Sequence, residues 1–350
     1  MYLSCRDCAD NQRGPLADRG AYARIASGDG VANRSDRGGR FSSCCVQQPA
    51  RLFGQRARAC YDCGARGDGP DDPQLAPLRF SELDEAVDII EDIEEWRRRF
   101  ADWRPKGDDL ADYPWVRNRR APFMPARRAL PMLNLALISS AGAYIDGTQP
   151  FDTTSSTGDL TFREIPIEVE ASDLRFAARG YDSAAVQQDV NAQLPVERLL
   201  EFESNGIIGQ LNPVFWSFSG FIPDAARFVD ELLPKLVERV HRYEVQAALL
   251  VPASRLCHQS VGLLARGIEF AGVPTMTLAV VKDVVESVRP PRVALYDGEF
   301  GTVSGLPNWP EHQRRILDEA LRLIEPMDQA GIRKLVVALE SAVEKSRGER

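Results

Sequence analysis

The side chains best suited to covalent chemistry lie at the start of one predicted helix. Residues 247–251 are an apolar run that predicts a buried strand, residues 252–256 form a polar turn, and Cys257 opens a helix that continues to Phe270. A thiol in the first turn of a helix meets unpaired backbone N–H groups, whose partial positive charge favours thiolate over thiol. Cys257 is also the only cysteine in the well-patterned part of the chain. We therefore take it as the candidate nucleophile, the alternative being a small buried residue packed under the sheet.

Polar residues close to Cys257 in the sequence could assist the thiol. Ser254 could donate a hydrogen bond to a thiolate or to a substrate carboxylate, or it could cap the predicted helix. His258 and Ser260 are candidate substrate contacts, and the backbone N–H groups of 257–260 could complete a polar cradle. Adjacent helical residues do not face each other, which favours a structural role for His258 over a proton shuttle beside the thiol.

Five further residues complete the candidate site. Glu164 and Asp182 lie in loop motifs and could act as general acid or base, or could hold the loops through backbone hydrogen bonds. Ser139, Arg163 and Tyr181 are candidate substrate contacts. We predict no metal site among these residues.

The elements that must position these residues alternate along the chain. Continuous apolar runs separated by helical patterns predict an α/β fold, in which a mostly parallel sheet is flanked by helices in Rossmann-like layers. The predicted strands are 133–138, 162–169, 246–251, 275–281 and 292–296, and the predicted helices are 195–205, 225–243, 257–270, 310–325 and 329–346. A loop-rich insertion covers 145–182. Ligands of such folds gather outside the carboxyl ends of the strands, where Ser139, Ser254–Ser260 and residues 297–301 should meet.

Composition divides the chain into three parts. Residues 1–78 have no helical or strand period, and the first 63 residues contain six of the seven cysteines but no lysine or glutamate. This predicts a disordered or wrongly annotated extension that cannot offset its ordering entropy. Residues 79–130 predict a helix beginning near Ser81, with apolar positions from Ala86 to Trp103, and then a Pro/Arg-rich wrapping segment. Residues 131–346 predict the α/β domain.

The cysteine spacing in residues 1–78 also allows a zinc site as an alternative to a disordered extension. Cys5-x-x-Cys8 and Cys60-x-x-Cys63 have the pairing typical of zinc sites, but the gap of about fifty residues is far longer than the usual fifteen to twenty. The extension remains the favoured interpretation.

Charge and hydropathy exclude several classes of protein. A net charge of −8 and a pI near 5.2 argue against a nucleic-acid binder. No apolar run is long enough to span a membrane, and the N-terminus lacks the apolar core of a secretory signal. We expect a cytoplasmic protein with free thiols.

Six separated segments resemble one known family. In chain order they are residues 158–166 (GDLTFREIP), 179–182 (RGYD), 206–211 (GIIGQL), 218–223 (FSGFIP), 251–262 (VPASRLCHQSVG) and 271–275 (AGVPT). Together they resemble the selenoprotein B family of glycine, sarcosine, betaine and D-proline reductases, most closely the proline-reductase type of subunit. The likeness covers about residues 131–325.

The resemblance implies a redox function. Family members use selenocysteine or cysteine in the turn after the strand, with a second cysteine three residues on. The nucleophile attacks the α-carbon of an amino acid held as a Schiff base by a pyruvoyl-bearing partner subunit, and an external dithiol or thioredoxin-like reductant regenerates it. The resemblance therefore implies an amino-acid-like substrate and a homo- or hetero-oligomer.

The chain departs from the family pattern at the key position. The selenocysteine position falls on Ser254, the second thiol on Cys257 and a third cysteine of some members on Ser260. A serine hydroxyl without an adjacent base is a poor nucleophile and cannot form a selenenyl-sulfide. The sequence therefore leaves two main hypotheses: a thiol-dependent reductase subunit in which Cys257 attacks alone, or a substrate-binding or structural subunit without redox turnover. Non-reductive C–S or C–N bond chemistry at Cys257 is a third that lies between them.

Overall fold

A mostly parallel sheet forms the centre of the computed structural model, which describes residues 88–104 and 107–337. All of these lie in the second of the two units into which the chain divides after Ala76. The eight strands of this sheet run in the order β10-β9-β8-β7-β1-β6-β3, with β5 also paired to β1. They are β1 (Asn134–Ser139), β3 (Phe162–Pro166), β5 (Gln210–Leu211), β6 (Val214–Phe218), β7 (Ala247–Val251), β8 (Thr275–Ala279), β9 (Arg292–Leu295) and β10 (Gly331–Lys334). Only β3 runs antiparallel, against β6. The predicted fold class is confirmed.

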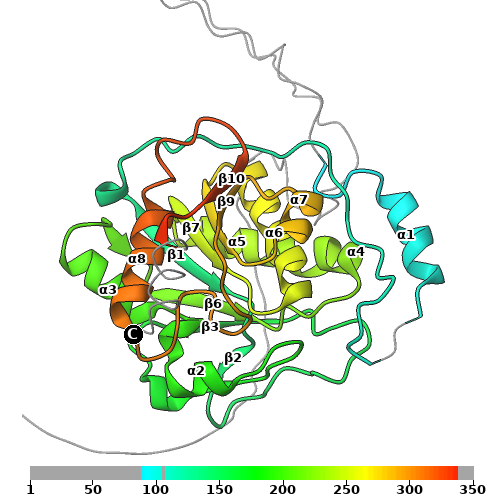
Figure 1. The fold of residues 1–350 in the computed structure, drawn as a ribbon, viewed down its shortest axis with the longest axis horizontal. Helices are drawn as coiled ribbons and strands as arrows, with labels where there is room; N and C mark the ends of the chain where they lie inside the picture. Colours follow the sequence, from blue (N-terminus) through cyan, green and yellow to red (C-terminus); the bar gives the residue numbers. More distant parts are fainter. Residues whose placement is uncertain (1–87, 105–106, 338–350) are drawn as a thin grey trace, which may run out of the picture. The chain divides into compact units, whose positions relative to one another are not determined.

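Both faces of the sheet are buried, which is why its strands read as continuous apolar runs. Along β7, Leu249 and Val251 pack into one core cluster while Leu250 packs into another. The first cluster includes residues of α3 (Val196–Ser204) and α8 (Pro310–Leu321), and the second includes residues of the opposite helices. Figure 1 shows these helices on either side of the sheet.

The helices of the second face come from the middle of the chain. They are α4 (Ala225–Arg227), a π-helical turn (Phe228–Leu232), α5 (Leu233–Arg242), α6 (Arg255–Phe270) and α7 (Lys282–Val288). Asp224 accepts a hydrogen bond from the Arg227 N–H, as expected for the predicted cap. No helix in the described part of the chain is both long enough and apolar enough to cross a bilayer.

The predicted loop-rich insertion, residues 145–182, contains β3 of the main sheet and β4 (Leu174–Phe176), and α2 (Ala184–Gln188) follows it. A small second sheet pairs β4 with β2 (Ala143–Ile145), which lies at the start of the insertion. Short 3₁₀ turns at Leu130–Met132, Ala171–Asp173 and Val190–Ala192 complete the secondary structure.

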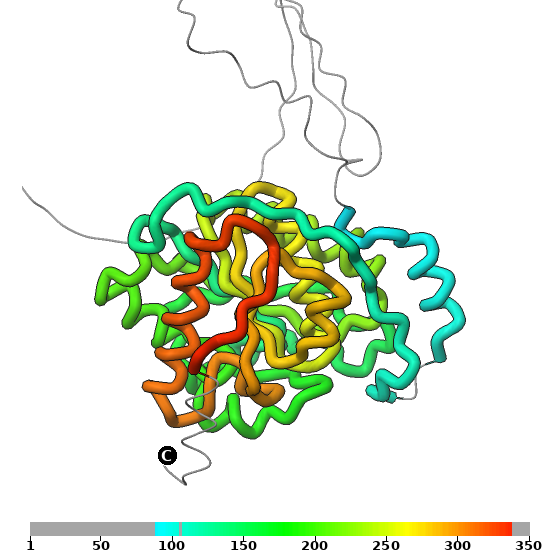
Figure 2. Tube along the Cα trace, turned by 45° about the horizontal axis from the view of Figure 1, so that its top comes forward, coloured from blue at the N-terminus to red at the C-terminus, as the bar shows by residue number. Residues whose placement is uncertain are grey.

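Residues 107–129, here called the strap, run over α6 and α7. The Asn118 side-chain amide donates to the Val288 carbonyl, and the Val116 N–H donates to the Gln259 side chain. Figure 2 shows this blue-green segment passing from α1 (Ile93–Asp102) along the outside of the described body. The strap therefore ties the first helix to the helical layer that carries Cys257.

Two helix predictions differ from the structure. The helix predicted over 329–346 is replaced at its start by β10, because pairing of Gly331–Lys334 with β9 satisfies the backbone at the sheet edge. The remainder from residue 338 lies outside the described residues. Within the described residues, the first helix, predicted to begin near Ser81, begins at Ile93. Ser81 and Ala86 lie outside the described residues, while Ile89 and Ile90 are buried but precede the helix.

Candidate functional site

The first turn of α6 holds the candidate thiol. Ser254 is the N-cap residue with extended backbone, and its Oγ accepts from the Cys257 N–H at 3.3 Å. The same hydroxyl donates to the Cys257 Sγ across 3.0 Å. Ser254 therefore caps the helix and also contacts the sulfur, so the two roles that the sequence offered as alternatives share one hydroxyl.

Cys257 is enclosed, with only 1% of the residue exposed. Ala141, Ala253 and Cys257 form a small apolar cluster, against which Phe176 and Tyr181 pack. The main chain of Gly220 comes so close that a Cβ there would lie 2.9 Å from the sulfur and 2.4 Å from the Ser140 Cβ. The sulfur is thus packed among small and polar groups at the carboxyl edge of the sheet, and a reactant can reach it only if a covering segment moves.

Loops from three parallel strands meet beside the thiol, as predicted. The Ala253 N–H donates to the Ser140 Oγ at 3.0 Å, and the Gly301 N–H donates to the Ala253 carbonyl at 3.0 Å. Ser139 ends β1, where its Oγ accepts from the Ala141 N–H. Ser139 is buried and supports this turn rather than facing an open cleft.

Ser260, one turn further along α6, contacts the segment that packs against the sulfur. Its Oγ donates to the Gly220 carbonyl at 2.8 Å, and the residue is 2% exposed. This bond fixes the segment that closes over the sulfur. Ser260 is therefore brought to the site, in contact with the glycine rather than with open space.

His258 is fully buried and has both ring nitrogens engaged with the main chain. Its Nδ1 lies 2.6 Å from the Ser254 carbonyl, and its Nε2 accepts from the Val280 N–H at 3.1 Å. A carbonyl can only accept, so the neutral tautomer carries its proton on Nδ1. Burial lowers the pKa of His258 to about 4. These contacts bind the start of α6 to the end of β8 and leave no free nitrogen for the substrate contact that the sequence suggested.

Tyr181 and Asp182 lie in the loop that covers the thiol. The Tyr181 hydroxyl donates to the Ala141 carbonyl at 2.7 Å. Burial, and to a smaller extent the Cys257 sulfur, raises the pKa of Tyr181 above its usual range, so the hydroxyl remains a donor. Asp182 is exposed, and its Oδ1 accepts from the Ala184 N–H at the start of α2. Tyr181 is thus beside Cys257, while the Asp182 carboxylate stabilises the loop.

Glu164 and Arg163 make their contacts elsewhere, contrary to their predicted place in the site. The Glu164 carboxylate accepts from the Trp216 Nε1 at 3.0 Å and from the Tyr243 hydroxyl at 2.6 Å. Tyr243 follows α5, near the amino-terminal edge of β1. Arg163 donates to the Gln149 carbonyl and stacks over Phe151. Both residues lie in β3, within the strand predicted over 162–169, and β3 is an edge strand that β6 and β1 separate from β7 and its thiol-bearing turn.

Gln193 is a buried residue near the site that the sequence analysis missed. Its Nε2 donates to the Pro252 carbonyl at 2.9 Å, and its Oε1 accepts from the Val303 N–H at 3.2 Å. These bonds join two of the loops that meet at Cys257. A single glutamine between Ala192 and Leu194, in no recognised motif, gives no signal of this role in the sequence.

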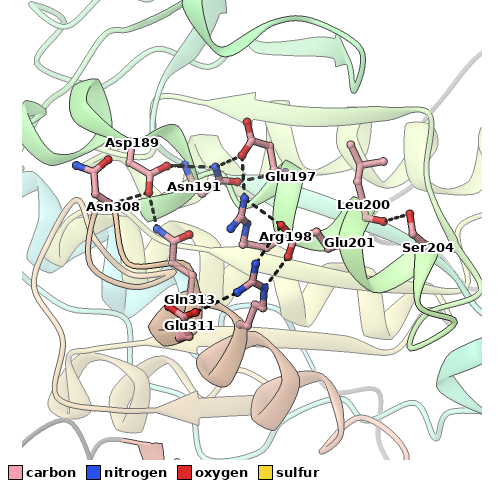
Figure 3. A network of polar contacts seen from close by, with 11 residues as sticks. Asp189, Asn191, Glu197, Arg198, Leu200, Glu201, Ser204, Asn308, Glu311 and Gln313 are labelled. Atoms are coloured by element: carbon pink, nitrogen blue, oxygen red, sulfur yellow. Dashed lines mark hydrogen bonds and ion pairs between the residues drawn. The ribbon is translucent and has the colours of Figure 1, made fainter. Parts of the chain in front are cut away.

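A polar network continues from this region to α3 and α8 (Figure 3). Asp189 accepts from the Gln313 side chain at 2.6 Å and from the Asn308 N–H at 2.9 Å. Burial opposes its ionisation, but these hydrogen bonds and those from Asn191 lower the pKa of Asp189. The carboxylate therefore anchors the loop that leads to Gln193.

The donor set does not suggest a metal centre. Among residues 88–104 and 107–337 there is no group of three or more His, Cys, Asp and Glu side chains placed to hold a metal ion. The cysteine pairs considered for zinc, Cys5/Cys8 and Cys60/Cys63, lie outside the described residues.

Comparisons with known proteins extend the sequence resemblance. The family model for glycine/sarcosine/betaine reductase selenoprotein B matches residues 110–253. The D-proline reductase subunit gamma of Acetoanaerobium sticklandii is 29% identical over 209 residues, which are 60% of this chain and 85% of that protein. No solved structure matches the chain.

Two further relatives match this chain over less than half of their own length. The glycine reductase complex component B subunit gamma of Symbiobacterium thermophilum is 25% identical over 52% of this chain and 43% of that protein. The sarcosine reductase complex component B subunit beta of Peptoclostridium acidaminophilum is 26% identical over 52% of this chain and 42% of that protein. The chain thus spans less than half the length of these two relatives. The family match and these relatives make the chain similar to members of the selenoprotein B family.

Proposed function

We propose that this chain is a subunit of a multi-component reductase complex, with Cys257 as the nucleophile in reductive cleavage of a C–N bond. The observation that carries the proposal is the 3.0 Å contact between the Ser254 Oγ and the Cys257 Sγ. The family resemblance assigns selenocysteine and its partner thiol to these two positions. Their side chains touch on the first turn of α6, so the chain keeps the geometry of a reactive pair while one member is replaced.

The chemistry at one thiol needs a reductant from outside the chain. The Cys257 thiolate would attack the substrate α-carbon, forming a C–S bond as the nitrogen leaves with the bonding electron pair. A thiolate of an external dithiol would then attack the sulfur, and the carbon would leave with its electron pair and take up a proton. The second thiol of the same molecule would release Cys257, so that one dithiol is oxidised to a disulfide for each C–N bond reduced.

Other chains would complete such a site. A pyruvoyl group on a partner subunit would supply a carbonyl that holds the substrate amine. Relatives named as subunits of glycine, sarcosine and D-proline reductases support a hetero-oligomer and an amino-acid-like substrate. Free thiols persist in a reducing compartment, and we assign the reaction to the cytoplasm on that ground.

The alternative is a subunit without redox turnover. Two observations favour it: the thiol is only 1% exposed, and the neighbouring position is a serine that cannot close an internal disulfide. In that case the Ser254–Cys257 contact would serve only to cap α6.

Amine-dependent oxidation of dithiothreitol by the chain co-expressed with a pyruvoyl-bearing partner separates the two functions. We expect D-proline, glycine or sarcosine to drive oxidation of one dithiol per molecule reduced. Cys257→Ser should lower the rate at least a hundredfold, because an alcohol is a far weaker nucleophile. Ser254→Cys should raise it, because a second thiol can then resolve the first within the chain.

The matched control is the double variant Cys60→Ser, Cys63→Ser, which removes two thiols distant in sequence and should keep the parent rate. Amine-dependent turnover that survives Cys257→Ser would refute the assignment of the nucleophile. Its complete absence with all three amines would favour the structural subunit.

A further inference from the structure

Cys257 is shielded by a short loop, residues 177–182, which we call the cover loop. Within this loop Gly180 has a left-handed backbone with φ +77°, and a Cβ there would meet the Phe221 ring at 2.6 Å and the Ser254 Cβ at 3.2 Å. The ring of Tyr181 packs on the cluster that contains the sulfur. The cover loop therefore lies directly against both members of the Ser254–Cys257 pair.

Side chains rather than the main chain hold most of the cover loop. The Ala177 N–H donates to the Gly142 carbonyl. From 178 to 182, no backbone-to-backbone hydrogen bond joins the loop to any other part of the chain that the structure describes. Segments with few such bonds open at a lower free-energy cost than the strands beneath them.

Arg179 supplies most of the side-chain attachment. Its Nε donates to the Asp108 carboxylate in the strap at 2.9 Å, and its Nη1 donates to the Ser155 carbonyl at 2.5 Å. Its guanidinium also lies over the Phe221 ring, 4.4 Å from the centroid. Phe221 follows Gly220, the residue that packs against the sulfur. One arginine thus joins the cover loop to three separate segments around the thiol.

The two charged groups of the Arg179–Asp108 ion pair differ in their exposure to solvent. The Arg179 side chain is 10% exposed, whereas the Asp108 side chain is 50% exposed. The arginine is therefore held in place by packing, while its carboxylate partner can be reached from solvent. Such a pair contributes little to global stability but can set how often one loop opens.

We propose that Arg179 is a latch that controls access to Cys257, and that its ion pair with Asp108 of the strap is the point at which the latch is released. Loss of the Asp108 pair leaves Arg179 its contacts with Ser155 and Phe221. Once these break as well, the loop is still held by the Tyr181 hydroxyl on the Ala141 carbonyl and by the Ala177 N–H on the Gly142 carbonyl. Movement of the cover loop would uncover the sulfur for a small electrophile or a dithiol. This inference rests on the proposed role of Cys257 as nucleophile, but its test does not require enzymatic activity.

The test measures alkylation of Cys257 by iodoacetamide in the folded full-length chain. Trypsin releases residues 256–266 (LCHQSVGLLAR), so mass spectrometry reports this thiol separately from the other six. Arg179→Ala removes all three contacts and should raise the labelling rate about ten- to a hundredfold. Asp108→Asn removes only the ion pair and should raise it about two- to fivefold, while Asp108→Glu should return it toward the parent rate.

Asp146→Asn is the matched control. Asp146 also pairs with an arginine, Arg175 at 2.7 Å, but that arginine lies in β4 just before the cover loop. We expect its labelling rate to change less than about twofold. Denaturant unfolding followed by tryptophan fluorescence identifies any variant whose faster labelling reflects global unfolding.

Two results would overturn the latch. One is labelling of Arg179→Ala and Asp108→Asn at the parent rate. The other is an increase in the alkylation rate of Cys257 no larger than the one expected from the variants' loss of global stability. Faster labelling without amine-dependent turnover would uphold the latch and count against the proposed reductase, so the two ideas fail separately.

Discussion

Ser254 organises the first turn of α6 with both its side chain and its main chain. The hydroxyl contacts the Cys257 amide and sulfur, while the carbonyl accepts from the His258 N–H and lies 2.6 Å from its Nδ1. His258 in turn accepts from Val280 at the end of β8. His258 therefore bridges the start of α6 and the end of β8, and protonation of its Nε2 would remove the acceptor for the Val280 N–H.

His258 should make the folded state sensitive to acid. Its pKa is lowered by burial from 6.5 to about 4, so between these values the unfolded chain binds more protons than the folded one. The stability from the neutral ring is complete above about pH 6.5 and is lost as pH falls toward 4. The loss is on the order of 3 kcal/mol. Denaturant titrations followed by tryptophan fluorescence at several pH values measure it.

The variant His258→Asn removes this titration and should flatten the slope between pH 6.5 and 4, whatever its stability at neutral pH. His241→Asn, on an exposed position of α5, is the matched control and should keep the parent slope. Equal slopes for the parent and His258→Asn would show that the ring is not buried in its neutral form.

At the scale of elements, a buried ion pair joins the strap to the α/β layers. Arg292 at the start of β9 and Glu269 near the end of α6 are both 0% exposed in their side chains, with 2.6 Å between Nη1 and Oε1. Glu269 also accepts from the Met124 N–H, and Arg292 donates to the Met124 carbonyl. Each charge is thus paired and also bonded to the same strap residue, as a buried pair requires.

Glu269→Gln should destabilise the fold by about 3–5 kcal/mol, because it leaves the Arg292 guanidinium buried without a counter-charge. Replacing both residues, as Glu269→Leu with Arg292→Met, should recover much of this loss. The comparison is Glu231→Gln, which breaks an ion pair whose side chains are 44% exposed, and which should cost less than about 1 kcal/mol. Urea unfolding of the three variants gives the values, and equal losses for Glu269→Gln and Glu231→Gln would contradict this account.

The sequence predicted the parallel strands well because burial on both faces gives a continuous apolar run, as in β7. It failed at β10, since an edge strand of four residues carries no such run and forms through pairing with β9. Cys257 and Ser254 could be placed together because they share one helical turn. Glu164 and Arg179 could not be placed, because their partners Tyr243 and Asp108 lie 79 and 71 residues away along the chain.

At the scale of the whole molecule, the core of the described part is built from residues 89–337. Two large clusters, one on each face of the sheet, contain most of its buried apolar side chains. All five tryptophans of the chain lie between Trp96 and Trp309. The Arg/Gly-rich residues 1–76 have a composition that cannot bury much apolar surface. The stability of the α/β domain should therefore not depend on them.

A chain that begins at Pro77 should keep the parent unfolding curve. We expect the free energy of unfolding from tryptophan fluorescence to change by less than about 0.5 kcal/mol, the range typical of changes remote from packed or bonded groups. Addition of zinc or a chelator should likewise leave the full-length curve unchanged, because the cysteine pairs fall outside this core. A large loss of stability on truncation, or a zinc-dependent shift that vanishes in Cys60→Ser, would instead make the N-terminal segment a metal-stabilised part of the fold. That outcome would require the extension to bind the α/β domain or to fold around an ion of its own, since its composition alone offers neither core nor periodicity.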